Sequence, residues 1–329
     1  MTKTSLSLGL LGAALLLCLY TGPAQAQATR TWVSGVGDDV NPCSRTAPCK
    51  TYAGAISKTA TGGEINCLDP GGFGALTITK SISVVCDYTE GGVLSAGTTG
   101  FIINIAVAGS IVTLKGQDIE CVGTGVNGIN IIGAGSIVHI HKTQIRNCRG
   151  GGSGIVVAPS SGNHEVYVAD SYITDNGTGT TTGGITIRPT VAATANLTVN
   201  RTQIENNFVG IIADGASSTG PAINVVLRDS LVSGSANNGI TATTTAGHAA
   251  IVGMIQNTAV TGNAGTGISA NGAASSGLGS AIIRVGGSVI AHNVAGLNSS
   301  GLGQVRSYTT NQVNDNLAGE TFAGNDPPK

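Results

Sequence analysis

The sequence predicts an all-β fold, a parallel β-helix in which every turn of the chain supplies three short strands. One observation is a thirteen-residue template, clearest in VNRTQIENNFVGI (199–211), that recurs from Leu114 to the C-terminus. It comprises an apolar residue, a polar turn, a second apolar residue, an Asn, and a Gly followed by Ile or Leu. Within the copies apolar and polar residues alternate, which is typical of strands. A repeat of this length indicates stacked supersecondary units.

Seven copies of the template align. The first apolar residue falls at Leu114, Ile140, Val168, Val199, Val226, Ile255 and Val285, and the second at Ile119, Ile145, Ile173, Ile204, Leu231, Val260 and Ile290; a weaker eighth copy follows at Tyr308 and Val313. Gly residues such as Gly210 mark the corner before the third strand, where a side chain fits poorly. We expect an inward column through Ile129, Ile155, Ile185, Ile211, Ile240, Ile268 and Leu297. Such columns build a core from few aromatic residues.

Polar residues repeat at two turn positions. One position holds Thr143, Ser171, Thr202, Asp229, Thr258 and Ser288, and the other holds Asn176, Asn207, Asn263, Asn293 and Asn316. We interpret both as structural ladders that hydrogen-bond to turn backbone. The position before the hydroxyl ladder carries Lys142, Asp170, Arg201, Arg228 and Asn257, which indicates either an exposed salt-bridge ladder or a polysaccharide-contacting strip. Glu120 and Arg146 are expected to pair in the same exposed way.

The N-terminus has the pattern of a secretory signal peptide, residues 1–26. Lys3 precedes an apolar run from Leu6 to Tyr20 and an A-x-A cleavage site ending at Ala26. The run is too short to anchor the chain in a membrane, and no second long apolar run follows. The sequence therefore predicts a secreted or periplasmic protein without a membrane span.

Residues 27–64 are predicted to form a cap over the first coil. A short helix is expected between Lys50 and Ala60, with Tyr52, Ala55 and Ile56 on its apolar face and Gly62-Gly63 at its end. It would cover strand edges that could otherwise template aggregation. The β-helix is expected to span residues 65–316. The tail, residues 317–329, loses the pattern, and we expect it to be poorly ordered or loosely folded over the last coil.

Six cysteines lie beyond the signal peptide, and an even number in an exported chain favours disulfides. We predict the pairs Cys43–Cys49, Cys67–Cys86 and Cys121–Cys148. The first pair brackets a proline-containing turn, and the last two cysteines follow equivalent apolar residues on consecutive coils, where stacked neighbours are close enough to be linked. No C-x-x-C pair is present beyond the signal peptide, so zinc ligation is not favoured.

Residues Trp32 to Asn316 resemble the right-handed parallel β-helix repeat family of pectate lyases, galacturonases, alginate epimerases and uncharacterised secreted bacterial proteins. The resemblance rests on the repeat and on an N-terminal stretch that contains WVSGVGD (32–38), NPC (41–43), APCKT (47–51) and GGEI (62–65). It implies a right-handed coil whose open end is plugged by the short helix. It also implies that a ligand lies along the strand that follows the Gly corner.

The outward positions of that strand are the candidate site. They include Asn130, Thr186, Arg188, Asp214, Thr241, Thr243 and Asn271, with Tyr172 and Phe208 as the aromatic residues expected near a groove. Asn130, Thr186, Thr241, Asn271 and Tyr172 are the predicted ligand-binding residues. Arg188 and Asp214 occupy matching places on successive coils and are the candidates for catalysis.

The residues of this face favour binding over catalysis. A uronate lyase needs clustered carboxylates for Ca²⁺ and a base such as Arg, but Asp214 stands alone. The histidines, His139, His141, His164, His248 and His292, are expected on different faces. The sequence therefore predicts a non-catalytic glycan-binding or surface protein with no metal site and no cofactor. The alternative is a polysaccharide lyase or glycoside hydrolase acting on an acidic polysaccharide, the one case in which Ca²⁺ is expected.

The overall charge excludes one class of partner. Charged residues make up 10% of the chain, and the formal net charge is −1. A protein that binds nucleic acid through a basic field carries a clustered positive charge instead. Nucleic acid is therefore not expected as a partner, whereas the family resemblance implies a polysaccharide.

Overall fold

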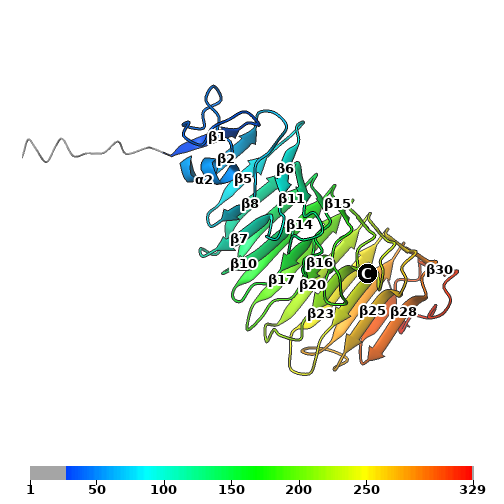
Figure 1. The fold of residues 1–329 in the computed structure, drawn as a ribbon. Helices are drawn as coiled ribbons and strands as arrows, with labels where there is room; N and C mark the ends of the chain where they lie inside the picture. The colour runs from blue at the N-terminus through cyan, green and yellow to red at the C-terminus, as the bar shows by residue number, and fades with distance from the viewer. Residues whose placement is uncertain (1–26, 328–329) are drawn as a thin grey trace, which may run out of the picture.

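The computed structural model describes residues 27–327, which form a parallel β-helix with three sheets (Figure 1). Each coil contributes one strand to sheet A, then one to sheet B and one to sheet C, before the chain rises to the next coil. The coils stack into an elongated body that runs from the N-terminal cap to the C-terminal tail (Figure 1). Within this described part, no helix is long and apolar enough to cross a membrane.

The three sheets are assembled from strands that are far apart in sequence. Sheet A contains β1 (Ala28–Val33), β2 (Thr59–Cys67), β5 (Ile82–Val85), β8 (Ser110–Lys115), β11 (Ser136–His141), β14 (Asn163–Ala169), β17 (Thr194–Asn200), β20 (Ala222–Arg228), β23 (Ala250–Gln256), β26 (Ala281–Gly286), β29 (Gln304–Ser307) and β31 (Gly324–Asn325). Sheet B contains β3 (Gly71–Gly72), β6 (Gly91–Leu94), β9 (Gln117–Glu120), β12 (Gln144–Arg146), β15 (Tyr172–Thr174), β18 (Gln203–Glu205), β21 (Leu231–Ser233), β24 (Ala259–Thr261), β27 (Val289–Ala291) and β30 (Gln312–Asn314). Sheet C contains β4 (Leu76–Ile78), β7 (Phe101–Ile105), β10 (Ile129–Gly133), β13 (Ile155–Val157), β16 (Gly183–Ile187), β19 (Val209–Asp214), β22 (Ile240–Thr243), β25 (Thr266–Gly272) and β28 (Ala295–Gly301).

The core consists of the inward columns that the repeat predicts. In sheet C the pairing partners run Ile129, Ile155, Ile185, Ile211, Ile240, Ile268 and Leu297. All seven side chains are buried. Because successive residues of a strand point to opposite faces, this register also fixes which side chains point outward.

The turn between sheets A and B is held by a left-handed residue followed by a hydroxyl. Lys142, Asp170 and Arg201 have φ values of 49°, 53° and 45°. The hydroxyl of Ser171, next in its turn, donates to a carbonyl of the same turn (2.8 Å) and accepts from the amide of Thr143 one coil away (3.2 Å). The predicted hydroxyl ladder is therefore confirmed as structural scaffolding.

The fifth copy of the repeat is displaced by one residue from its predicted register. Leu227, not Val226, pairs with Val199, and Val232, not Leu231, pairs with Ile204. The ladder member in this coil is therefore Ser230, which replaces the predicted Asp229, and Asp229 takes the left-handed position assigned to Arg228. The sequence allowed the error because Val225, Val226 and Leu227 are all apolar, and alternation alone does not choose between them.

The turn between sheets B and C contains the predicted asparagine ladder, which points into the coil. Asn207 Oδ1 accepts from the backbone amide and from the side-chain amide of Asn176, each at 3.0 Å. Asn293 and Asn316 repeat the arrangement at the C-terminal end. In the displaced coil the same position is Ser235, which is buried and whose hydroxyl has no hydrogen-bond partner within residues 27–327. The ladder is therefore interrupted at this coil.

The helix plugs the first coils, as predicted, but it is shorter than the sequence indicates. Helix α2 spans Tyr52–Lys58, and the side chain of its N-cap, Thr51, accepts from the amide of Gly54 (2.9 Å). The helix ends directly in β2, so Gly62-Gly63 lies within the strand and does not terminate the helix. Buried Tyr52 lies 5.2 Å from the ring of Phe73, and its hydroxyl donates to Gln117 (2.7 Å).

All three predicted disulfides are present. Cys43–Cys49 lies in the cap. Cys67–Cys86 joins the ends of neighbouring strands of sheet A, and Cys121–Cys148 joins the chain just after neighbouring strands of sheet B. The Cα separations are between 4.7 and 4.8 Å. Cys148 also stands at the head of the asparagine ladder, where its amide donates to Asn176 Oδ1 (3.0 Å). Three disulfides are consistent with an extracytoplasmic location. The predicted signal peptide, residues 1–26, lies outside the described residues.

The tail lies over the last coil. Ala318 and Gly319 accept hydrogen bonds from β28, and β31 adds two residues to the edge of sheet A beside β29. In the eighth copy Val313 pairs with Ile290 as predicted, but Ser307, not Tyr308, is the partner of Val285. Tyr308 therefore leaves the core column and reaches the surface.

One buried histidine, His164, ties the loop after β10 to the start of β14. The His164 ring is fully buried, with Nδ1 3.2 Å from the hydroxyl of Ser136 and Nε2 3.4 Å from the carbonyl of Gly133. This arrangement suits the neutral ring, which donates from Nε2. Burial lowers the pKa of His164 below its ordinary value.

Restoring the interrupted ladder is expected to stabilise the fold. In Ser235→Asn, the new side chain can accept from the Asn207 amides and donate toward Asn263, as its counterparts do on other coils. The expected gain is about 1 kcal/mol in the free energy of unfolding, the net value of a typical buried hydrogen bond. Chemical denaturation measures it. Ala236→Asn, at the neighbouring exposed position, is the matched control and should leave stability unchanged; an equal or larger gain in the control would contradict this account.

The buried neutral His164 predicts a pH-dependent stability. The pKa of His164 is lower in the folded protein than in the unfolded chain. At pH values between these two pKa values, the unfolded chain therefore binds more protons than the folded protein. The contribution of His164 to the free energy of unfolding is at its maximum above about pH 6.5. It decreases as the pH falls toward the folded pKa of His164, by at most about 1.4 kcal/mol per pH unit. Denaturation of His164→Asn between pH 5 and 8 should show a shallower dependence than the parent protein. Exposed His292→Asn should retain the parental dependence, and an unchanged slope in His164→Asn would refute the assignment.

Candidate functional site

The outward residues of sheet C, where the ligand was expected, lie in two columns. One contains Asn130, Val156, Thr186, Ile212, Thr241 and Ser269, and the other contains Arg188, Asp214, Thr243 and Asn271. Asn271 is exposed, and Asn130 and Thr241 are partly exposed. These three retain access to solvent, but they do not lie in one line.

The middle of the first column is covered, so the prediction that Thr186 points to solvent is wrong. Its hydroxyl lies 2.8 Å from that of Ser153, and the residue is 1% exposed. Its column neighbours Val156 and Ile212 are buried as well. Sheet C therefore lacks the flat line of hydrogen-bonding groups that the sequence suggested.

Arg188 and Asp214 lie at matching places but are engaged separately. The Arg188 guanidinium donates to the carbonyl of Thr181 in the preceding loop (3.3 Å), and Asp214 accepts from the amide of Ala216 (3.0 Å). They form no ion pair with each other in the part of the chain that the structure describes. Their catalytic role stays a hypothesis.

Tyr172 belongs to another face. It lies on β15 of sheet B, in register with Gln144 and Gln203. It therefore cannot line the same groove as Asn130 and Asn271. The asparagine turn separates the strand of Tyr172 from the strands of sheet C, so the expected position of Tyr172 beside the sheet C site is not observed.

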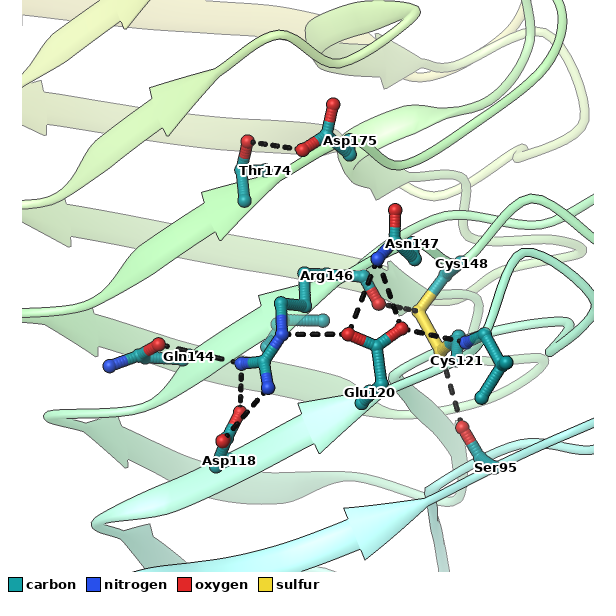
Figure 2. A network of polar contacts seen from close by, with 12 residues as sticks. Ser95, Asp118, Glu120, Cys121, Gln144, Arg146, Asn147, Cys148, Thr174 and Asp175 are labelled. Atoms are coloured by element: carbon teal, nitrogen blue, oxygen red, sulfur yellow. Dashed lines mark hydrogen bonds and ion pairs between the residues drawn. A yellow bond between two sulfur atoms is a disulfide. The ribbon is translucent and has the colours of Figure 1, made fainter.

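Sheet B carries a dense polar network around Arg146 (Figure 2). The guanidinium pairs with Asp118 and, through Nε, with Glu120 (2.7 Å). Glu120 also accepts from the side chain of Asn147 (3.0 Å) and from a backbone amide (2.8 Å). Hydrogen bonding to Asp118 raises the pKa of Arg146. Each charged group of this network has a partner of opposite charge, and the network lies close to the Cys121–Cys148 bridge. We therefore interpret the network as structural, as the sequence suggested for Glu120 and Arg146.

Sheet A presents an aromatic cluster that the sequence interpretation missed. His139 stacks on Tyr167 of the next coil, with ring centroids 5.0 Å apart and planes 15° apart. His141 lies on the same face of the same strand, 5.9 Å from His139. The prediction that the histidines occupy different faces is therefore wrong for this pair. The signal was present in the sequence, because residues two apart in a strand share a face.

Charged groups surround the cluster. Lys115 pairs with His141 in the register of β8 and β11 and forms an ion pair with Asp87. The hydrogen bond to Asp87 raises the pKa of Lys115, so this side chain stays charged. Burial, together with His139, lowers the pKa of His141, so that ring is neutral at neutral pH. Tyr167 donates its hydroxyl to Glu165 (3.0 Å), which raises the pKa of Tyr167.

An amide ladder continues the sheet A face along the coils. Asn196 donates to Asn163 (3.3 Å), and Asn224 donates to Asn196 (2.7 Å). These side chains are exposed or partly exposed and retain unused donors and acceptors. The sheet A face thus combines rings with hydrogen-bonding groups over several consecutive coils.

The same face ends in a groove of about 920 Å³ near the C-terminus. Its walls and floor include Met254, Gln256, Arg284, Tyr308 and Asp326. Met254 and Arg284 lie in the column that contains Tyr167, so the groove continues the aromatic face. Tyr308 reaches the groove because of the register shift in the last coil.

Metal binding is not supported by the side chains in residues 27–327. Nowhere in this range do three or more His, Cys, Asp or Glu side chains gather closely enough to hold a metal ion. The carboxylates of sheet B are paired with Arg146, and Asp87 is paired with Lys115.

Comparisons with known proteins identify relatives by structure alone. No protein-family model matches the sequence, and no curated protein is significantly similar to it. A pectate lyase, Pel9A, superposes with a TM-score of 0.65 at 15% identity, over 91% of this chain and 78% of that one. A rhamnogalacturonan lyase (TM-score 0.36, 12% identity, 87% and 86% of the chains) and a lacto-N-biosidase from Eubacterium ramulus (TM-score 0.38, 11% identity, 88% and 67%) are more distant.

The match to the pectate lyase bears on the fold and leaves the activity open. The pectate lyase match covers most of both chains, which confirms the resemblance to the pectate lyase-like β-helix at the level of architecture. At 15% identity it carries no site residues across, because one fold hosts many functions. The protein is a parallel β-helix whose fold is similar to that of the pectate lyase Pel9A.

Proposed function

We propose that the protein is an exported polysaccharide-binding protein whose ligand lies along the outward face of sheet A. The observation that carries the proposal is the stacked pair of His139 and Tyr167, continued by the amides of Asn196 and Asn224. The two rings cover one face of each other, and their outer faces and polar edges suit contact with sugar rings. Amide side chains supply donors and acceptors for hydroxyl groups.

The shape of the face supports an extended ligand. Strands of successive coils are about 4.8 Å apart, so the aromatic and amide residues form a ladder along the body. A polymer with repeated hydroxyls can contact many coils weakly, and the contacts add up along its length. The groove at Met254 and Arg284 gives the ladder a concave end. The fold of the pectate lyase Pel9A is compatible with this use, since that protein is named for activity on a polysaccharide.

A second candidate, cleavage of an acidic polysaccharide by β-elimination, is favoured by His141 and Lys115. A neutral His141 could remove the proton next to a uronate carboxylate, while charged Lys115 would balance the negative charge that develops there. The electrons of the broken C–H bond form the new double bond, and the glycosidic oxygen leaves and takes up a proton from water. The abstracted proton stays on His141 and is later released to solvent. The rate would rise with pH through the lowered pKa of His141, because only the neutral ring accepts a proton.

Binding to polygalacturonate and to a neutral galactan, measured by affinity electrophoresis, tests the primary proposal. Tyr167→Ala should weaken binding about tenfold, a loss of about 1.4 kcal/mol, because it removes the stacked ring. Tyr172→Ala, the same substitution on sheet B, and Arg188→Ala on sheet C are the matched controls and should bind like the parent. Loss of binding in either control, with Tyr167→Ala unaffected, would transfer the site to another sheet.

The same proteins distinguish binding from cleavage. Ultraviolet absorbance of the unsaturated product should stay flat for a pure binder. Steady growth that is abolished by His141→Ala and Lys115→Ala, and retained by Arg188→Ala, would establish the elimination reaction on sheet A. Growth abolished by Arg188→Ala instead would restore the site predicted from sequence.

A further inference from the structure

The groove at the end of sheet A contains a carboxylate site that the chain itself fills. Arg284 of β26 and Arg306 of β29 are partners in the sheet register and point outward from adjacent strands. Both donate to one carboxylate, that of Asp326 in the tail. Arg284 Nε lies 2.7 Å from Oδ2, and Arg306 contacts Oδ1 through Nε (2.9 Å) and Nη2 (2.7 Å).

The three side chains are sheltered, though not sealed from solvent. The exposed fractions of the Arg284, Arg306 and Asp326 side chains are 32%, 25% and 22%. Two guanidinium groups on one carboxylate form a strong, directional anion site. Without Asp326, two neighbouring cations would repel each other at this position, so the pair favours an anion.

The segment that delivers Asp326 is held by few contacts. Strand β31 contributes only two residues to sheet A, and backbone bonds join Ala323 to Val305 (2.8 Å) and Asp326 to Ser307 (2.8 Å). The Arg306 side chain also donates to the carbonyl of Asn325 (3.1 Å). Phe322 packs against the core and is the last such anchor among residues 27–327. Beyond Phe322, the described chain is joined to β29 by this short edge pairing and to the two arginines by polar contacts of Asn325 and Asp326.

The position of Asp326 matters because this residue also forms a wall of the groove. Asp326 and Pro327 border the cavity together with Tyr308, and Arg284 lies within it. Removing the tail therefore would widen the groove and free both arginines in one movement. A ligand carboxylate placed there would take over the hydrogen bonds of Asp326.

We propose that Arg284 and Arg306 form a binding site for a carboxylate-bearing sugar, and that Asp326 occupies this site as a tethered competitor until such a ligand displaces the tail. The inference extends the proposed function by naming a uronate as the ligand class for the groove. The site requires only one carboxylate, so it also accepts a short uronate that is too small to reach Tyr167.

A tethered competitor lowers the observed affinity by the fraction of molecules in which the site is open. Asp326→Asn keeps the size of the side chain but removes its charge, so the tail should be displaced more readily. We expect the full-length Asp326→Asn protein to bind digalacturonate about three- to tenfold more tightly than the parent in calorimetric titration. This range corresponds to a parent protein in which the tail occupies the arginine site in most molecules. Asp315→Asn removes a carboxylate from the same end of the molecule, outside the groove, and should bind like the parent.

Two further comparisons make the test decisive. The dimethyl ester of digalacturonate, which is neutral, should not bind detectably to any of these proteins, and Arg284→Gln in the Asp326→Asn background should abolish digalacturonate binding. In the parent protein, digalacturonate should speed hydrogen exchange at the amides of Ala323 and Asp326 as the tail leaves. Equal affinity of Asp326→Asn and the parent, or equal binding of acid and ester, would overturn the inference.

These outcomes are separate from those of the proposed function. If polysaccharide binding depends on Tyr167 but Asp326→Asn changes nothing, the binding face stands and the tail is a purely structural cap. If digalacturonate binds more tightly to Asp326→Asn while no polysaccharide binds and Tyr167→Ala has no effect, the carboxylate site stands without the sheet A ladder.

Discussion

The hydrogen-bonded register between successive coils is the constraint on which the rest of this structure depends. A slip of one residue turns every side chain of a strand to the opposite face. The coils are fixed against such slips by ladders at their corners, where Asn207 binds Asn176 and Ser171 binds Thr143. The same register that buries Ile211 therefore also aligns the outward residues of sheet A. Core and surface are two results of one arrangement.

Much of the fold could be predicted because its information is local and repeated. The inward isoleucine column, the asparagine corner and the Cys121–Cys148 disulfide follow from residues at a fixed place in each copy. The capping helix follows instead from the local apolar spacing of Tyr52, Ala55 and Ile56, and the other two disulfides lie in the segment before the first copy. Prediction failed where a copy offers two equivalent registers. Val225, Val226 and Leu227 give the fifth coil two apolar frames, and the ladder bonds from Thr202 to Ser230 and from Ser235 to Asn263 match one of them. Such a choice depends on the neighbouring coil, which the sequence of one copy does not contain.

The candidate site was less accessible to sequence reasoning for a different physical reason. Outward residues are defined by strand alternation, but their exposure depends on loops whose course the repeat does not encode. Thr186 points away from the core and is nevertheless buried against Ser153. On sheet A the outward residues stay open, and His139 and Tyr167 meet because their strands differ by one coil. The aligned copies place His139 and Tyr167 at the same position of consecutive coils, so the sequence contained their pairing. It was missed because sheet C, not sheet A, was taken as the ligand face.

Oxidative footprinting of the full-length protein, with and without polygalacturonate, tests the central claim most directly. Hydroxyl radicals oxidise exposed Tyr, His and Met side chains, and mass spectrometry assigns each modification to a residue. The account predicts that the ligand protects Tyr167, His139 and Met254 on sheet A and leaves Tyr172 on sheet B unprotected. Protection of Tyr172 with no change at Tyr167 would contradict it.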